Sequence, residues 1–101
     1  MDGTLVVFWL PPKTSANEHG SFRRWCYGRD VQTWGGRYRY HLRGILDEIP
    51  SVRLYTGVVI VRIEDGRRLI SFLQQNGARA VTRRVKLTME DQRRLGSPAG
   101  R

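Results

Sequence analysis

The stretch best suited to chemistry combines aromatic rings with cationic side chains between Phe22 and Arg43. It contains six of the chain's ten aromatic residues, with arginines at short intervals among them. Guanidinium groups neutralise phosphates and exposed rings stack on bases, so this mixture is typical of a surface for RNA or single-stranded DNA. The residues that we predict to bind nucleic acid are Arg23, Arg24, Arg29, Trp34, Arg37, Tyr38, Arg39, Tyr40 and Arg43.

Two roles divide this set: the arginines are expected to contact phosphates, and the rings of Trp34, Tyr38 and Tyr40 to stack on bases. The alternative is that rings of the stretch simply pack against a sheet. We expect that alternative to hold for Phe22 and for at least one other ring. Trp34, between Thr33 and Gly35, is the ring least easily placed in a core.

The charge balance points to a polyanionic partner. The 101 residues include 18 Lys+Arg and 9 Asp+Glu, which gives a formal charge of +9 and an isoelectric point of about 11.0. Such an excess favours RNA, DNA, an anionic membrane or an acidic protein as the partner. A generally basic surface without a specific role would give the same totals.

Residues for catalysis or metal binding are few. His19 and His41 are the only histidines, and there is no HExxH motif, cysteine pair or nucleophile elbow. We therefore predict no catalytic residue, no metal site and no cofactor. The alternative is a metal-dependent nuclease whose carboxylates come from Glu18, Asp30 or Glu64.

Cys26 is the only cysteine, so no disulfide can form within the chain, which fits a reducing cytoplasm. We expect it on the buried side of a helix, where its role is packing. The longest apolar run, Leu5 to Leu10, is too short to span a bilayer. We expect a cytoplasmic protein with no membrane association.

The first half of the chain must position the ring-rich stretch. Residues Thr4 to Leu10 are apolar on both faces and predict an interior strand that ends at two prolines. A short helix is predicted for Phe22 to Tyr27, with Ser21 as its N-cap, Phe22, Trp25 and Cys26 on its buried side and Gly28 as its stop. Residues 29 to 36 are predicted to form a loop.

The segment from Arg37 to Ile49 has two readings. Tyr38, Leu42, Ile45, Leu46 and Ile49 fall on one face of a helix, and we favour the helix. Residues Arg37 to Leu42 also alternate with period two, and Gly44 disfavours a helix, so a strand there is the alternative.

The second half of the chain predicts regular elements with clear boundaries. Two strands joined by a turn at Thr56-Gly57 come first, then a helix capped by Asp65, a further strand and a last helix capped by Thr88 with Asp91. The expected ranges are Val52 to Tyr55, Val58 to Ile63, Gly66 to Gln75, Ala80 to Leu87 and Met89 to Leu95.

The order strand-helix-strand-strand-helix-strand predicts an α+β, ferredoxin-like antiparallel sheet with helices on one face and a long first crossover. Residues 1–96 are expected to form a single domain, with 97–101 as a flexible tail. A small chain gains stability from assembly, so we predict a homodimer. A third possible function is that of an adaptor or assembly subunit, because aromatic and arginine residues are also enriched at protein interfaces.

Size, strand order and basic character resemble the small ferredoxin-like nucleases of CRISPR adaptation. That family carries an acidic residue at the end of its first strand, whereas this strand ends in Trp9-Leu10-Pro11-Pro12. The resemblance therefore implies an architecture and carries over no metal site.

Overall fold

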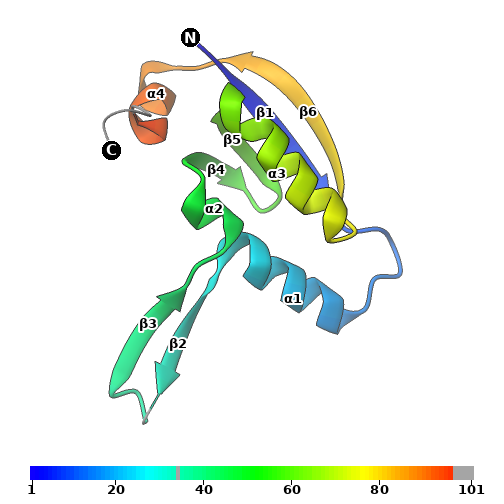
Figure 1. Ribbon diagram of the computed structural model, residues 1–101, viewed down its shortest axis with the longest axis vertical. Helices are drawn as coiled ribbons and strands as arrows, with labels where there is room; N and C mark the ends of the chain where they lie inside the picture. The colour runs from blue at the N-terminus through cyan, green and yellow to red at the C-terminus, as the bar shows by residue number, and fades with distance from the viewer. Residues whose placement is uncertain (34, 97–101) are drawn as a thin grey trace. The chain divides into compact units, whose positions relative to one another are not determined.

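The computed structural model describes residues 1–33 and 35–96. The chain divides into two compact units: unit 1 holds residues 1–12 and the chain from Ile49 onward, and unit 2 holds Lys13–Glu48. Helices and strands follow one another in the order β1, α1, β2, β3, α2, β4, β5, α3, β6 and α4 (Figure 1). The predicted α+β class with an antiparallel sheet is confirmed.

The sheet of unit 1 contains β1 (Asp2–Trp9), β4 (Ser51–Tyr55), β5 (Val58–Arg62) and β6 (Arg79–Lys86). Its spatial order is β4-β5-β1-β6, and each neighbouring pair is antiparallel. The prediction of an interior first strand is confirmed, because β1 pairs on both sides. Gly57 has a φ of +83° in the turn between β4 and β5, as the Thr56-Gly57 signal predicted.

Helix α3 (Ile63–Gln75) covers one face of this sheet. The buried side chains of Val6 and Val59 lie opposite each other in β1 and β5, on the face that Thr4 shares. A Cβ built on Gly66 of α3 would lie 3.4 Å from Thr4 Oγ1, so this face contacts the helix. The fully buried Leu69 and Leu73 of α3 supply the apolar stripe.

Helix α4 (Met89–Leu95) packs against the opposite face. Its buried Leu95 joins Val52 and Ile60 in one apolar cluster, with Leu5 and Val85 packed beside it. The expectation that all helices lie on one face is therefore wrong for unit 1. The physical reason is that β1 and β5 carry apolar side chains on both faces, so the second face also needs cover.

Unit 2 contains α1 (Ala16–Tyr27), β2 (Arg29–Thr33), β3 (Tyr38–Leu42) and α2 (Ile45–Glu48). Strands β2 and β3 form a separate two-stranded antiparallel sheet. Among the described residues of the unit, the buried side chains are Phe22 and Cys26 from α1 and Ile45 and Leu46 from α2. This second sheet, with its flanking helices, forms the expected long first crossover.

Three predictions for unit 2 are wrong. Helix α1 begins at Ala16, not Phe22, because Ser15 and Glu18 form a capping box six residues before the predicted cap. Residues 29–33 are a strand, not a loop, and residues 38–42 are the strand that was the alternative to a helix. Cross-strand hydrogen bonds between the two segments, which no single-segment pattern reveals, decide both outcomes.

The boundaries elsewhere follow the predictions closely. Helix α4 has the predicted capping box of Thr88 with Asp91, and α3 ends at Gln75 with Asn76 as its C-cap. The predicted cap at Asp65 is wrong: α3 begins at Ile63, and the Asp65 carboxylate instead accepts a 2.7 Å hydrogen bond from Arg62 Nε. The predicted tail, residues 97–101, lies outside the described residues.

Within the described ranges, no helix has the length and apolar character needed to cross a membrane.

Candidate nucleic-acid interface

The hairpin β2–β3 carries most of the predicted binding residues. Its strands turn through Gly35 and Gly36, whose φ angles of +65° and +88° are accessible to glycine without strain. The Gly36 N–H donates to the Thr33 carbonyl at 3.2 Å and closes the turn. In Figure 1 the two strands form a ribbon that extends away from α1 and α2 of the same unit.

The register of the hairpin divides its side chains between two faces. Tyr40 lies opposite Val31, and Tyr38 lies opposite Thr33, so both rings share one face, which also includes Arg29 and Leu42. We call this the ring face. His41 lies opposite Asp30, and Arg39 lies opposite Gln32, which places these four side chains on the polar face.

The ring face is open to solvent. The exposed fractions of Tyr38, Tyr40 and Leu42 are 56%, 51% and 47%. A two-stranded hairpin needs an apolar face packed against something to be stable in water, and exposed rings in a row do not serve that purpose. The ring face is therefore available to a ligand.

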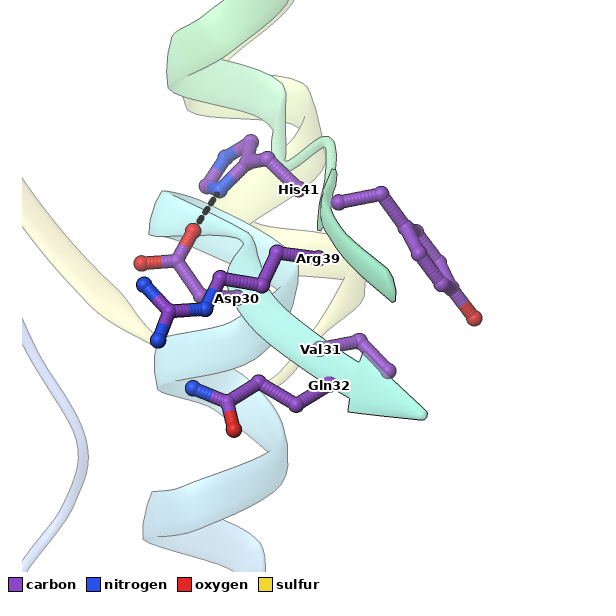
Figure 2. Close-up of a pocket in the computed structure, with 6 residues that line it drawn as sticks. Asp30, Val31, Gln32, Arg39 and His41 are labelled. Carbon is purple, nitrogen blue, oxygen red and sulfur yellow. Dashed lines mark hydrogen bonds and ion pairs between the residues drawn. The ribbon is translucent and has the colours of Figure 1, made fainter. Parts of the chain in front are cut away.

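The polar face holds a shallow depression of about 370 Å³, lined by Asp30, Gln32, Arg39 and His41 together with Val31 and Tyr40. Figure 2 shows the side chains of Asp30, Gln32, Arg39 and His41 on the same side of the hairpin. An amide, a guanidinium and a carboxylate are thus presented together, which suits hydrogen bonding to a polar ligand.

His41 is held between two carboxylates. Its Nδ1 lies 2.9 Å from Asp30 Oδ1, and its Nε2 lies 2.7 Å from Asp47 Oδ2. Carboxylates accept hydrogen bonds, so both ring nitrogens donate only when the ring is protonated. The hydrogen bonds to Asp30 and then to Asp47 raise the pKa of His41 above its ordinary value. With both nitrogens engaged, His41 connects the hairpin to α2 and has no nitrogen left for a metal or a substrate proton.

Two glycines allow the base of the hairpin to approach α1 closely. Gly28, the C-cap of α1, has a φ of +75°, and a Cβ there would lie 2.6 Å from His41 Nε2 and would overlap the Leu42 carbonyl oxygen. A Cβ on Gly44 would lie 2.5 Å from the Cys26 carbonyl oxygen. The Gly44 N–H also donates to Asp47 Oδ2 at 2.8 Å, so the same carboxylate holds both His41 and this turn.

The predicted binding residues belong to three parts of unit 2. Arg23 and Arg24 lie on α1, and Arg29 begins β2. The other described residues of the set, which are Arg37, Tyr38, Arg39, Tyr40 and Arg43, follow Gly36 of the hairpin turn. All of the described ones are exposed; these are Arg23, Arg24, Arg29, Arg37, Tyr38, Arg39, Tyr40 and Arg43. Trp34 lies outside the described residues.

Three arginines of this set, unlike some of those in unit 1, have no ion pair among the described residues. Across residues 1–33 and 35–96, no ion pair involves Arg29, Arg37 or Arg39, although Arg62 and Arg84 in unit 1 pair with Asp65 and Asp2 at 2.7 and 2.8 Å. Cations without acidic partners can neutralise phosphates without first breaking an ion pair.

The three candidate metal-binding carboxylates have other roles in the structure. Glu18 accepts from the Ser15 backbone N–H at 3.0 Å, and this hydrogen bond, more than any other interaction, lowers the pKa of Glu18. Asp30 contacts His41, and Glu64 lies 3.8 Å from Arg62 Nε. Glu18 lies in the first turn of α1, and Asp30 follows the end of this helix in β2, so about 14 Å of helix separates the two positions. In the part of the chain that the structure describes, no three His, Cys, Asp or Glu side chains are grouped as metal ligands.

Cys26 has the packing role that was expected. Its side chain is buried, and burial raises the pKa of its thiol to about 12. The thiolate, which is the nucleophilic form, is therefore scarce at neutral pH.

The sequence patterns did not identify two features of the site. Trp25 was expected on the buried side of α1, but it is 52% exposed, while Phe22 and Cys26 are buried. The pairing of His41 with Asp30 and Asp47 was also missed. The period-two alternation of residues 38–42 was the available signal for the second feature, because the strand it indicates can pair with residues 29–33.

Comparison of the chain with protein-family models, with curated proteins and with solved structures gave no match.

Proposed function

We propose that the protein binds nucleic acid through the hairpin β2–β3 and the adjoining end of α1. One observation carries this proposal: a hairpin with exposed tyrosines on one face also bears exposed arginines without acidic partners. Between Arg29 and Arg43 there are four arginines and one aspartate, so the local charge is positive. Cations and free aromatic faces together match a phosphate backbone that carries bases.

The test is the fluorescence anisotropy of labelled single-stranded and double-stranded RNA and DNA at several salt concentrations. The variant replaces two hairpin cations, Arg37→Gln and Arg39→Gln. The matched control replaces Arg67 and Arg79 of unit 1, which are also exposed and have no ion pair among the described residues. Both double variants lower the net charge by the same amount.

We expect the hairpin variant to bind about tenfold or more weakly, because a hydrogen bond to a charged group contributes about 1.5–3 kcal/mol. Its slope of log affinity against log salt should fall by about 1.4, which corresponds to two phosphate contacts at about 0.7 each. The control variant should change both quantities less. Equal losses in the two variants would mean that net charge alone drives binding, and absence of binding at low salt would overturn the proposal.

Two finer assignments accompany this function. The strand order β4-β5-β1-β6 with α3 on one face supports a ferredoxin-like assignment of unit 1, into which unit 2 is inserted between β1 and β4.

A cytoplasmic homodimer remains our prediction, and light scattering coupled to size-exclusion chromatography would measure the subunit number. Cleavage of the bound probe in Mg²⁺ or Mn²⁺ that stops with a chelator would favour the nuclease alternative.

A further inference from the structure

A second depression, on the ring-face side of unit 2, joins α1 to the base of the hairpin. It has a volume of about 230 Å³ and is lined by Arg24 and Trp25 from the last turn of α1, Arg29 from β2 and Leu42 from β3. It therefore combines a large ring, an aliphatic side chain and two guanidinium groups.

Packing within unit 2 does not account for the ring in this depression. Trp25 is 52% exposed, and among the described residues its indole N–H has no hydrogen-bond partner. The helix already has its buried residues in Phe22 and Cys26. An exposed tryptophan on an ordered helix offers a flat face to a ligand at little cost in conformational entropy.

The guanidinium groups of Arg24 and Arg29, like the Trp25 ring, are available to a ligand. Arg29 has no ion pair in the described ranges, and Arg24 makes only a 3.2 Å hydrogen bond to the Ser21 hydroxyl. Arginine presents a planar fork that matches phosphate oxygens bidentately. A ring beside two such groups matches the base and the phosphate of one nucleotide.

The depression continues into the ring face of the hairpin. Leu42, Tyr40 and Tyr38 follow one another at every second position of β3 on that face, about 7 Å apart. The exposed rings of Tyr38 and Tyr40 can stack only on bases that are not already stacked on neighbouring bases. Bases of a duplex are stacked on their neighbours, whereas bases of a single strand can turn onto aromatic side chains.

We infer that the depression formed by Arg24, Trp25, Arg29 and Leu42 is a nucleotide subsite for single-stranded nucleic acid, whose strand continues over Tyr40 and Tyr38. The base stacks on Trp25, and its phosphate lies between Arg24 and Arg29. This inference rests on the proposed function and adds a substrate class and a subsite between α1 and the base of the hairpin. Arg39 lies on the polar face and is therefore not part of this subsite.

The first test compares ring variants in anisotropy titrations of a short labelled oligothymidylate and of a DNA duplex of equal length. Trp25→Ala should bind the single strand about five- to a hundredfold more weakly, which corresponds to the stacking of one base, and Trp25→Phe should retain most of the affinity. Tyr55→Ala is the matched control, because Tyr55 is an exposed ring of unit 1. It should bind like the wild type.

The second test compares cations. Arg29→Gln should weaken single-strand binding more than Arg39→Gln, because only Arg29 lies on the ring face. Circular dichroism and thermal unfolding of each variant establish that it is folded before its affinity is interpreted.

The third test reports on the ring directly. In protein labelled with 5-fluorotryptophan, the ¹⁹F resonance of Trp25 should shift when oligothymidylate is added, and that of Trp9 in unit 1 should not. Single Trp→Phe variants assign the resonances. Trp9 is a suitable reference because it is also partly exposed, at 44%.

The outcomes separate the two proposals. Loss of binding in the Arg37/Arg39 variant with unchanged binding in Trp25→Ala overturns the subsite and leaves the proposed function intact. Equal affinity for duplex and single strand overturns the single-strand assignment. No binding of the wild-type protein to any nucleic acid overturns both.

Discussion

At the scale of single residues, His41 is the group whose chemistry depends most on its surroundings. Asp30 on β2 and Asp47 on α2 accept hydrogen bonds from its two nitrogens, and these contacts raise its pKa. A further charged group close to this cluster is Arg43, which donates to the Asp47 carbonyl oxygen at 3.0 Å. Protonation of the His41 ring therefore determines whether it can donate hydrogen bonds to both Asp30 and Asp47 at the base of the hairpin.

A pH dependence of stability follows. The pKa of His41 is higher in the folded protein than its ordinary value of 6.5, so its stabilising contribution is fully present below about pH 6.5. That contribution is lost as pH rises through the raised pKa. Urea unfolding over a pH series should show the loss in the wild type and not in His41→Gln.

The control for this experiment is His19→Gln. His19 is exposed on α1 and has no ion pair in the part of the chain described. This variant should keep the pH dependence of the wild type. If His41→Gln and the wild type lose stability in parallel above neutral pH, the two carboxylates do not stabilise the imidazolium. An NMR titration of the ring would locate the pKa independently.

At the scale of elements, the position of the hairpin on α1 depends on residues without side chains. Gly28 and Gly96 both end a helix, with nearly the same backbone angles of φ 75°, ψ −171° and φ 69°, ψ −178°. Their surroundings differ, because a Cβ on Gly28 would contact His41 and Asp47, whereas no described residue beyond the chain neighbours lies within 4 Å of a Cβ on Gly96.

Replacement of each glycine by alanine separates strain from crowding. Both variants place an L-residue in a glycine conformation, at a cost of about 1–3 kcal/mol in the free energy of unfolding. Gly28→Ala should cost at least about 1 kcal/mol more, since the hairpin base must also move. Urea denaturation measures the difference. Equal losses in the two variants would show that the hairpin base tolerates a side chain.

At the scale of the whole molecule, chain length limits how the two units can fold. Unit 2 comprises 36 residues, from Lys13 to Glu48, and has no disulfide. Chains below about 40 residues usually need disulfides, metals or assembly to fold alone. We therefore expect unit 2 to unfold together with unit 1, as the predicted single domain requires.

This expectation can be checked with a substitution in unit 1 and a probe in unit 2. Leu73→Ala removes a fully buried side chain of α3 and should cost about 2–5 kcal/mol. If unfolding is one transition, the Trp25 fluorescence midpoint should fall by the same amount as the far-ultraviolet circular dichroism midpoint. A Trp9→Phe, Trp34→Phe background isolates the Trp25 signal. A Trp25 midpoint that stays in place would mean that the units unfold separately.

Much of unit 1 could be predicted from the sequence. The run from Thr4 to Leu10 is apolar on both faces, which only an interior strand with cover on both sides accommodates. Thr88 with Asp91 indicated the start of α4, and Thr56-Gly57 indicated a tight turn. These signals are local, so tertiary contacts did not change them. The predicted N-cap at Asp65 is the exception, because the Asp65 carboxylate accepts a hydrogen bond from Arg62 instead of capping the helix.

The positive charge, the ring-rich stretch and the apolar segments of the sheet follow directly from the amino-acid sequence. Only the tertiary structure decided that residues 38–42 form a strand, because their spacing suits a helix and a strand alike until they pair with residues 29–33. The same pairing placed Tyr38 and Tyr40 on one face and Arg39 on the other. The physical reason is that strand pairing and the close approach at Gly28 and Gly44 join residues distant in the chain, and these contacts determine which rings remain exposed.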